Sequence, residues 1–162
     1  MAAGSTYTPI ATTTLGSAAN SFTFSSIPST YTDLILVVDG EVSVTAGCLF
    51  QFNGVGGTSY SFTYLYGTGS SAISGRGTSG SYIFATDLTT TRSTVIAQIQ
   101  NYSNTTTYKT AIFRGGAAGF DTAATVGLFA STSAISSIKV YADAARTFSI
   151  GSTFTLYGIK AA

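Results

Sequence analysis

The chain has 162 residues, which is enough for a single domain with its own hydrophobic core. Seven basic and six acidic side chains leave a net charge of +1, so the basic excess that nucleic-acid binding needs is missing. The longest aliphatic run, Leu34 to Val38, is far shorter than the roughly 20 apolar residues of a membrane-spanning helix. The opening MAAGSTYTPIATTT also lacks the basic start and apolar core of a secretory signal. We therefore expect no nucleic-acid partner and no membrane association.

Hydroxyl side chains take the place of charge, because Ser and Thr together supply 50 residues. Thr, Tyr, Phe, Val and Ile favour strands. Cys48 is the one cysteine, so no disulfide can form within the chain, and a small buried apolar residue is its expected role. A weakly charged, hydroxyl-rich surface is typical of a protein that works inside an assembly.

The first third of the chain predicts strands by its period-2 alternation. Residues Tyr7 to Leu15 fit either an extended N-terminal arm or a first strand, and both remain open. Ser21 to Ser25 alternates, and Pro28 ends that strand because proline cannot donate to a ladder. Asp33 to Asp39 (DLILVVD) is apolar on both faces, which predicts a central strand covered on both sides.

The middle of the chain begins with Cys48 to Phe52, a strand with Cys48, Phe50 and Phe52 on one face. Asn53-Gly54 and Gly56-Gly57 predict turns. Tyr60 to Tyr66 alternates most clearly. Gly67 to Gly80 (GTGSSAISGRGTSG) is rich in Gly and Ser, which predicts a long flexible surface loop around Arg76.

The remaining strands are separated by turn-like segments at Asn101 to Thr107, Gly115-Gly116 and Ala142 to Arg146. We expect these strands at Ser81 to Thr86, Thr94 to Tyr102, Tyr108 to Arg114, Thr125 to Ala130, Ile138 to Tyr141 and Thr153 to Ile159. About ten strands spaced near a dozen residues apart predict an all-β, antiparallel β-sandwich. A jelly-roll-like arrangement is preferred over an immunoglobulin-like one, which would want a Trp and a Cys pair. Residues 1–15 would form the arm or first strand, and 16–162 one β-sandwich domain.

Residues for catalysis are sparse. The chain has no His, which removes the commonest general base and the commonest zinc ligand. No Ser lies in a Gly-x-Ser-x-Gly elbow. Asp39 and Glu41 could share a face as a carboxylate pair, but a strand end emerging into solvent explains them better. No loop has the alternating Asp/Asn pattern of a calcium site. We expect no enzyme activity, no metal and no cofactor.

An aromatic stripe on one face of Tyr60 to Tyr66 leaves two interpretations open. Tyr60, Phe62, Tyr64 and Tyr66 could face the sandwich core, since the other face carries Ser61 and Thr63. They could instead form an exposed row that stacks on sugar rings or anchors a protein interface. A mixed arrangement, with Phe62 inside and Tyr66 at the rim, is also compatible with the pattern.

Three segments resemble small β-rich virion proteins of tailed bacteriophages, notably those of cyanobacterial and marine hosts. They are the opening YTPIATTTLGSAANSFTFSSIPSTYTDLILVV, the middle FNGVGGTSYS and the close FSIGSTFTLYGIKAA, and IPSTYTDLILVV and GSTFTLYGI carry the resemblance most specifically. The likeness runs nearly end to end. It implies a virion structural protein with a jelly-roll-like fold.

Two placements on the particle compete. A capsid cement or decoration protein would bind the major capsid protein on the head surface, as a homotrimer. A tail-fibre or knob component would bind a host-surface glycan or protein. The bare domain favours cement, because fibre proteins carry a shaft or attachment region. The candidate assembly contacts are the arm and the aromatic and arginine positions, namely Tyr7, Pro9, Ile10, Tyr64, Tyr66, Arg76 and Arg114.

Overall fold

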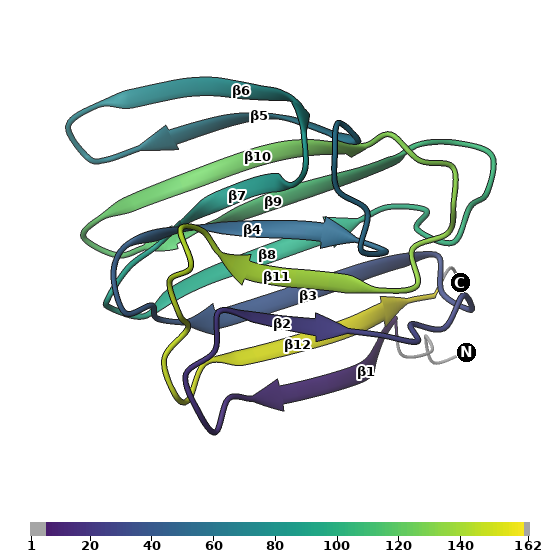
Figure 1. The fold of residues 1–162 in the computed structure, drawn as a ribbon, viewed down its shortest axis with the longest axis horizontal. Coiled ribbons are helices and arrows are strands. Elements are labelled where there is room, and N and C mark those ends of the chain that lie inside the picture. The colour runs from purple at the N-terminus through teal and green to yellow at the C-terminus, as the bar shows by residue number, and fades with distance from the viewer. Residues whose placement is uncertain (1–5, 161–162) are drawn as a thin grey trace.

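The fold is an antiparallel sandwich of two β-sheets. The computed structural model describes residues 6–160, and these form twelve strands and no helix. Every pair of neighbouring strands within each sheet runs antiparallel. The smaller sheet lies in front of the larger one in Figure 1. The all-β sandwich expected from the strand pattern is confirmed.

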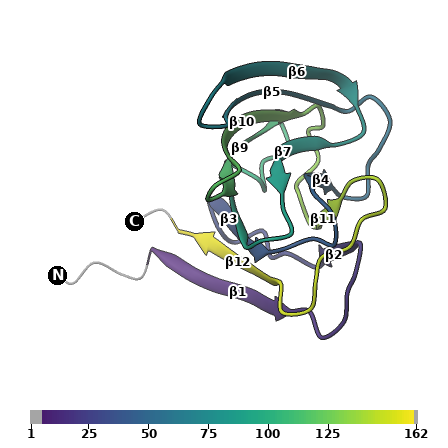
Figure 2. The ribbon, with the colours of Figure 1, turned by 90° about the vertical axis from the view of Figure 1, so that its left-hand side faces the viewer.

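The larger sheet has eight strands. Their order across the sheet is β1 (Tyr7–Thr14), β12 (Thr153–Ile159), β3 (Asp33–Gly40), β8 (Ser93–Ile99), β9 (Lys109–Ala117), β10 (Asp121–Phe129), β5 (Tyr60–Gly67) and β6 (Ala72–Gly80). The smaller sheet has four, in the order β2 (Ser21–Phe24), β11 (Ile138–Ala142), β4 (Ala46–Phe52) and β7 (Ile83–Leu88). Because the sheets are unequal, the hairpin of β5 and β6 reaches past β7, as the edge-on view shows (Figure 2).

The core lies between the sheets and follows directly from the alternation. On β3, Leu34, Leu36 and Val38 point inward and are completely buried, and on β12 Phe154 and Leu156 do the same. Each such side chain contributes about 1.5–3 kcal/mol relative to an exposed one. The single Cys48 is also fully buried among these residues, as its isolation in the sequence led us to expect.

Most of the Gly- and Ser-rich segment 67–80 is a strand, so the long flexible loop expected there is wrong. Residues Ala72–Gly80 form β6, which pairs with β5. A Cβ on Gly75 would come within 2.5 Å of the Tyr64 hydroxyl, and one on Gly77 within 2.5 Å of the Phe62 ring. The two rings therefore lie across the glycine backbone. This edge of the sheet needs glycine for packing, although the resulting composition is like that of a loop.

Gly115-Gly116 is not a turn, contrary to expectation. Both glycines lie within β9, and the turn follows at residues 118–120, where the Phe120 amide donates to the Ala117 carbonyl at 3.0 Å. Gly116 has φ of 144°, and a Cβ there would collide with the Asp121 backbone. Close approach of β9 and β10 explains the glycine pair.

Asn53-Gly54 is a turn, as expected, and both residues have positive φ, 55° and 66°. The Asn53 side chain then ties this turn to the segment before β11. Its amide donates to the Ala134 carbonyl at 2.8 Å, and its oxygen accepts from the Ser136 amide at 2.8 Å and the Ser137 amide at 3.2 Å. These bonds hold the end of β4 to a segment about 80 residues later in the chain, and they use most of the hydrogen bonds that an Asn side chain can make.

For Tyr7 to Leu15 the sequence left an extended arm and a first strand open, and the structure shows a strand. Tyr7–Thr14 forms β1 at the edge of the larger sheet, paired with β12, and the register shifts between Pro9 and Ala11. Residues 1–5 of the expected arm lie outside the described residues.

Candidate interaction face

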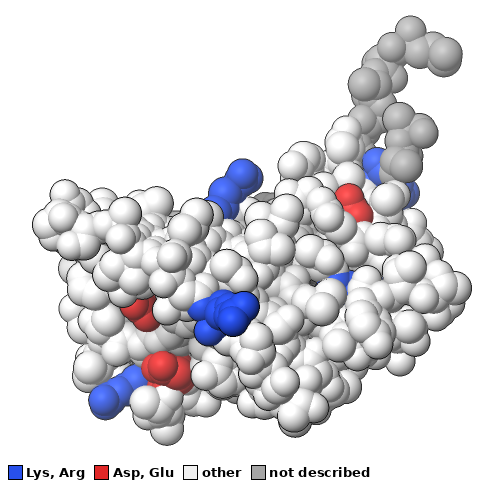
Figure 3. Space-filling model, turned by 90° about the horizontal axis from the view of Figure 1, so that it is seen from above, with Lys and Arg blue, Asp and Glu red and all other residues white. Residues whose placement is uncertain are grey.

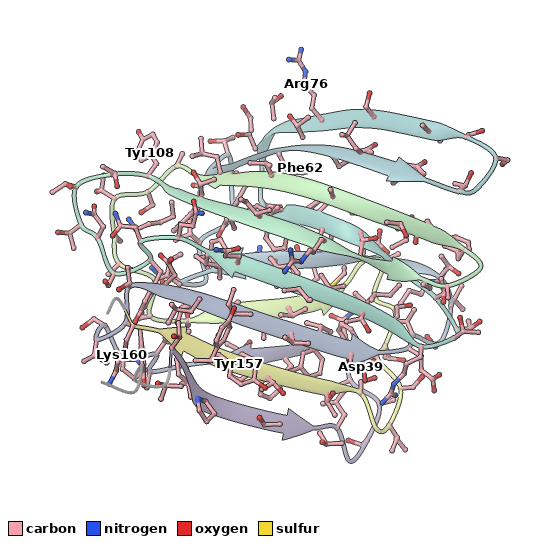
Figure 4. All side chains as sticks on the ribbon, turned by 180° about the vertical axis from the view of Figure 1, so that it is seen from behind. Asp39, Phe62, Arg76, Tyr108, Tyr157 and Lys160 are labelled. Carbon is pink, nitrogen blue, oxygen red and sulfur yellow. The ribbon has the colours of Figure 1, made fainter. Side chains whose placement is uncertain are left out.

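One whole face of the larger sheet points away from the smaller sheet. We call it the outer face. Its apolar members come from seven strands and include Pro9, Ile35, Val37, Leu65, Ile96, Ile112, Ala124, Val126 and Tyr157. Leu65, Val126 and Ile112 are 62%, 52% and 40% exposed. The sheet is seen from this side in Figure 4, where Tyr157 lies on β12.

The register of the strands arranges the outer face in two rows. The first row runs Tyr157, Ile35, Gln98, Ile112, Val126, Thr63 and Arg76. The second runs Thr155, Val37, Ile96, Arg114, Ala124, Leu65 and Ser74. Directly opposite side chains on neighbouring strands touch, so the aliphatic members of the two rows form one continuous surface.

The structure corrects one expectation at β3. This strand is central, as expected, since β12 and β8 flank it. Its inner face is covered by the smaller sheet, but no described element lies over its outer face. Ile35 and Val37 point out of the sandwich, but Ile35 is only 8% exposed, whereas Val37 is partly exposed.

Few charged side chains lie on the outer face, and Arg76 and Arg114 are two of them. Arg114 stands in the second row between Ile96 and Ala124, is exposed, and makes no hydrogen bond or ion pair with any described residue. A groove of about 600 Å³ separates it from the β5–β6 hairpin, with Leu65 and Ile73 among the residues on the hairpin side. Asp39, at the end of β3, is already neutralised by Arg92 at 3.2 Å. Charged side chains are also few on the side of the molecule that is seen from above (Figure 3).

The structure divides the expected assembly contacts between two sides. Tyr7 and Pro9 lie opposite Ile159 and Tyr157 on the outer face, and the Tyr7 ring centre is 6.3 Å from that of Tyr157. Arg76 and Arg114 point to the same face. Their companions do not, because Ile10 packs against the core and Tyr64 and Tyr66 lie on the inner side of β5.

The aromatic stripe of β5 takes the mixed arrangement. Tyr60 is completely buried, and its hydroxyl accepts from the Phe52 amide at 2.8 Å. The other three rings are half-buried on the inner side of β5, where two of them contact an aromatic ring of β7. They form a row in which ring centres lie 5.8 Å apart from Tyr66 to Tyr64 and 6.2 Å apart from Tyr64 to Phe62.

Residues 6–160 include several side chains with the chemistry for metal binding or nucleophilic attack. No three His, Cys, Asp or Glu side chains of that part lie close enough to hold a metal ion. The Cys48 thiol is sealed in the core, and burial raises its pKa. Lys109 is buried too, and its ammonium donates to the Thr107 and Thr132 carbonyls at 2.7 and 3.2 Å. The same part of the chain has no helix that could cross a membrane.

The side-chain pKa values of two acidic residues, Asp87 and Asp121, are raised. Burial raises the pKa of Asp87, and the neighbouring charges of Asp121 and Asp143 raise it further. Burial also raises the pKa of Asp121, against a hydrogen bond from the Ala117 backbone. The Oδ1 atom of Asp121 and the Oγ1 atom of Thr86 are buried without a hydrogen-bond partner among the described residues. The local sequence around Asp121 does not indicate that its side chain points into the sandwich.

Comparisons of the chain with protein-family models, with curated proteins and with solved structures found no match.

Proposed function

We propose that the protein is a non-enzymatic structural component of a bacteriophage virion, a cement protein that binds the major capsid protein on the head surface and stabilises the shell. The resemblance of IPSTYTDLILVV and GSTFTLYGI to phage virion proteins motivates the assignment. These two segments supply β3 and β12, which are neighbours in the larger sheet. Both segments contribute side chains to the outer face, namely Ile35, Val37 and Tyr157.

The observation that carries the proposal is the uncovered outer face. Eight strands about 4.8 Å apart span roughly 34 Å, and six or seven residues add roughly 20 Å in the other direction. The resulting area is about 700 Å², close to the roughly 800 Å² that each partner contributes to a standard protein interface. Burying aliphatic surface gains about 25 cal/mol per Å², and so few charges here need to be desolvated that little opposes this gain.

The strand order supports the jelly-roll-like part of the proposal. The chain visits the smaller sheet with β2, β4, β7 and β11, and returns to the larger sheet between each of these visits. In the smaller sheet, β11 lies between β2 and β4. Strands distant in sequence thus alternate within a sheet, as they do in jelly rolls. The homotrimer implied by the resemblance is likewise part of the proposal.

The row of half-buried rings favours one alternative. Phe62, Tyr64 and Tyr66 offer aromatic surface at the rim, which suits a tail-fibre or knob component that stacks on host glycans. The capsid role is preferred because two of the three rings already cover Gly75 and Gly77, whereas the most exposed aliphatic side chains of the outer face are 40% to 62% exposed.

Two measurements on purified particles separate these roles. Quantitative mass spectrometry gives the number of copies relative to the major capsid protein, and immunogold labelling gives their position. A cement protein is present in hundreds of copies and is labelled over the head. A handful of copies with label at the tail would overturn the capsid role, and absence from particles would overturn both.

A further inference from the structure

Strand β6 is the last strand of the larger sheet, next to β5. Figures 1 and 2 both show it at the extremity of the molecule with no described element beyond it. The backbone N–H and C=O groups on its outer side therefore have no strand to pair with. Such an edge is a template for another chain unless the protein blocks it.

The other end of the same sheet is blocked. Strand β1 carries Pro9, which cannot donate to a neighbouring strand, and its register shifts between Pro9 and Ala11. At the edge of the smaller sheet, β2 is only four residues long. In contrast to these two edge strands, β6 is nine residues long and contains no proline.

The segment Ala72–Gly77 of β6 is regular enough to accept a further strand. It pairs with β5 residue by residue, and the register shifts only between Phe62 and Tyr60. The rings of Tyr64 and Phe62 lie across Gly75 and Gly77 and hold the segment to its neighbour. A preformed edge loses little conformational freedom when a strand is added to it.

Arg76 decides which strand fits. It is the middle residue of the nine in β6, is exposed, and forms no hydrogen bond or ion pair with a described residue. Figure 4 shows its side chain projecting beyond the edge of the sheet. If two copies paired antiparallel over the whole of β6, Arg76 would face its own copy, and like charges directly opposite are destabilising. A carboxylate at that position would instead form a cross-strand ion pair.

We propose that the outer edge of β6 is a strand-addition site for an extended segment of a partner protein that places an Asp or Glu side chain opposite Arg76. Main-chain hydrogen bonds provide the affinity in this recognition mode, and the side chains opposite each other provide the selectivity. The inference stands on the sheet edge alone and is independent of the virion role.

The chain itself supplies the probe. An R76E variant presents a strand of the same sequence with a carboxylate at the decisive position. We expect wild type alone and R76E alone to leave the outward amides of Ala72–Gly77 exchanging rapidly with solvent. In the equimolar mixture these amides exchange several-fold more slowly, because Arg76 of one copy meets the carboxylate of the other.

Hydrogen exchange resolved at 72–77 is the readout, and it is insensitive to association through other surfaces. The matched control mixes wild type with R114E, which makes the same charge change at the centre of the outer face, and we expect no protection of β6 there. Protection in wild type alone would show that a second copy is the occupant. No protection in the R76E mixture would overturn the strand-addition site. R76E keeps the fold, since Arg76 contacts nothing that holds it, and its circular dichroism checks this.

Discussion

Ile112 on β9 and Val126 on β10 lie directly opposite each other, and both point out of the sandwich with 40% and 52% of their surface exposed. A cross-strand aliphatic pair is a unit of packing, yet here only one side of it is packed. Together with Leu65 one strand further along, the pair marks the centre of a surface that gains free energy when another surface covers it.

Replacing outer-face residues should affect attachment and leave the fold intact. We expect V126E and L65E each to change the free energy of unfolding by less than about 0.5 kcal/mol, because both side chains are largely exposed. Each should weaken head attachment by tenfold or more, since a carboxylate would be buried in the contact. Co-sedimentation with particles lacking the protein measures this.

The control for these variants is V44E. Val44 is similarly exposed, at 46%, but lies in the loop between β3 and β4 and not on the outer face. It should bind like wild type. Equal losses for all three variants would show that charge in general, and not this face, governs attachment.

Two glycine substitutions should differ in severity for a geometric reason. A Cβ on Gly127 would lie 2.5 Å from the Cγ2 atom of the buried Ile83, a side-chain contact that can be relieved by local repacking, so G127A should cost about 1–3 kcal/mol. A Cβ on Gly116 would strike the Asp121 backbone, and its φ of 144° disfavours any side chain. G116A should therefore cost more than G127A in urea denaturation. The reverse order would contradict the close approach of β9 and β10.

The side chain of Asn53 should contribute separately from its backbone conformation. We expect N53A to lose both, because it leaves the amides of Ser136 and Ser137 without their acceptor and places Ala at φ of 55°. N53G keeps the backbone conformation and loses only the bonds. Thermal unfolding should rank the stabilities as wild type, then N53G, then N53A, with about 1–3 kcal/mol assigned to the lost bonds. Equal stability of N53G and wild type would mean that the bonds contribute nothing.

Stability should fall as pH rises through the range where Asp121 and Asp87 ionise. The pKa of each is raised in the folded state, chiefly by burial, whereas an unfolded Asp titrates near pH 3.9. Between the two pKa values the native state binds more protons, so the free energy of unfolding decreases with increasing pH. Urea titrations from pH 4 to 8 test this. D121N should flatten the slope, and an unchanged slope would remove Asp121 as its source.

Most strands could be predicted because alternation and burial agree. The expected bounds of Thr153 to Ile159 match β12, and those of Asp33 to Asp39 differ from β3 by one residue. β6 was missed because its glycines are required by rings on β5, a contact between strands that local composition cannot reveal. The same limit applies to the site. The sequence marks Arg114 and Arg76 as candidates, but only the register places both on one face with Ile112 and Val126.

Sequence also separates the two sides of an apolar strand poorly. DLILVVD predicts burial of both faces of β3. The fold places the smaller sheet over one face only, and on the other face Ile35 is buried while Val37 is partly exposed. Val37 therefore keeps apolar surface on the outer side of this strand that a covering partner would bury.

The orientation of the protein on the particle tests the account most directly. A cryo-electron microscopy map of the virion, at a resolution that separates strands, shows which face of the sandwich meets its neighbour. We expect density for this protein on the head, with the outer face of the larger sheet, including Leu65, Ile112 and Val126, against the major capsid protein. Density at the tail, or density on the head with that face turned to solvent, would contradict the account.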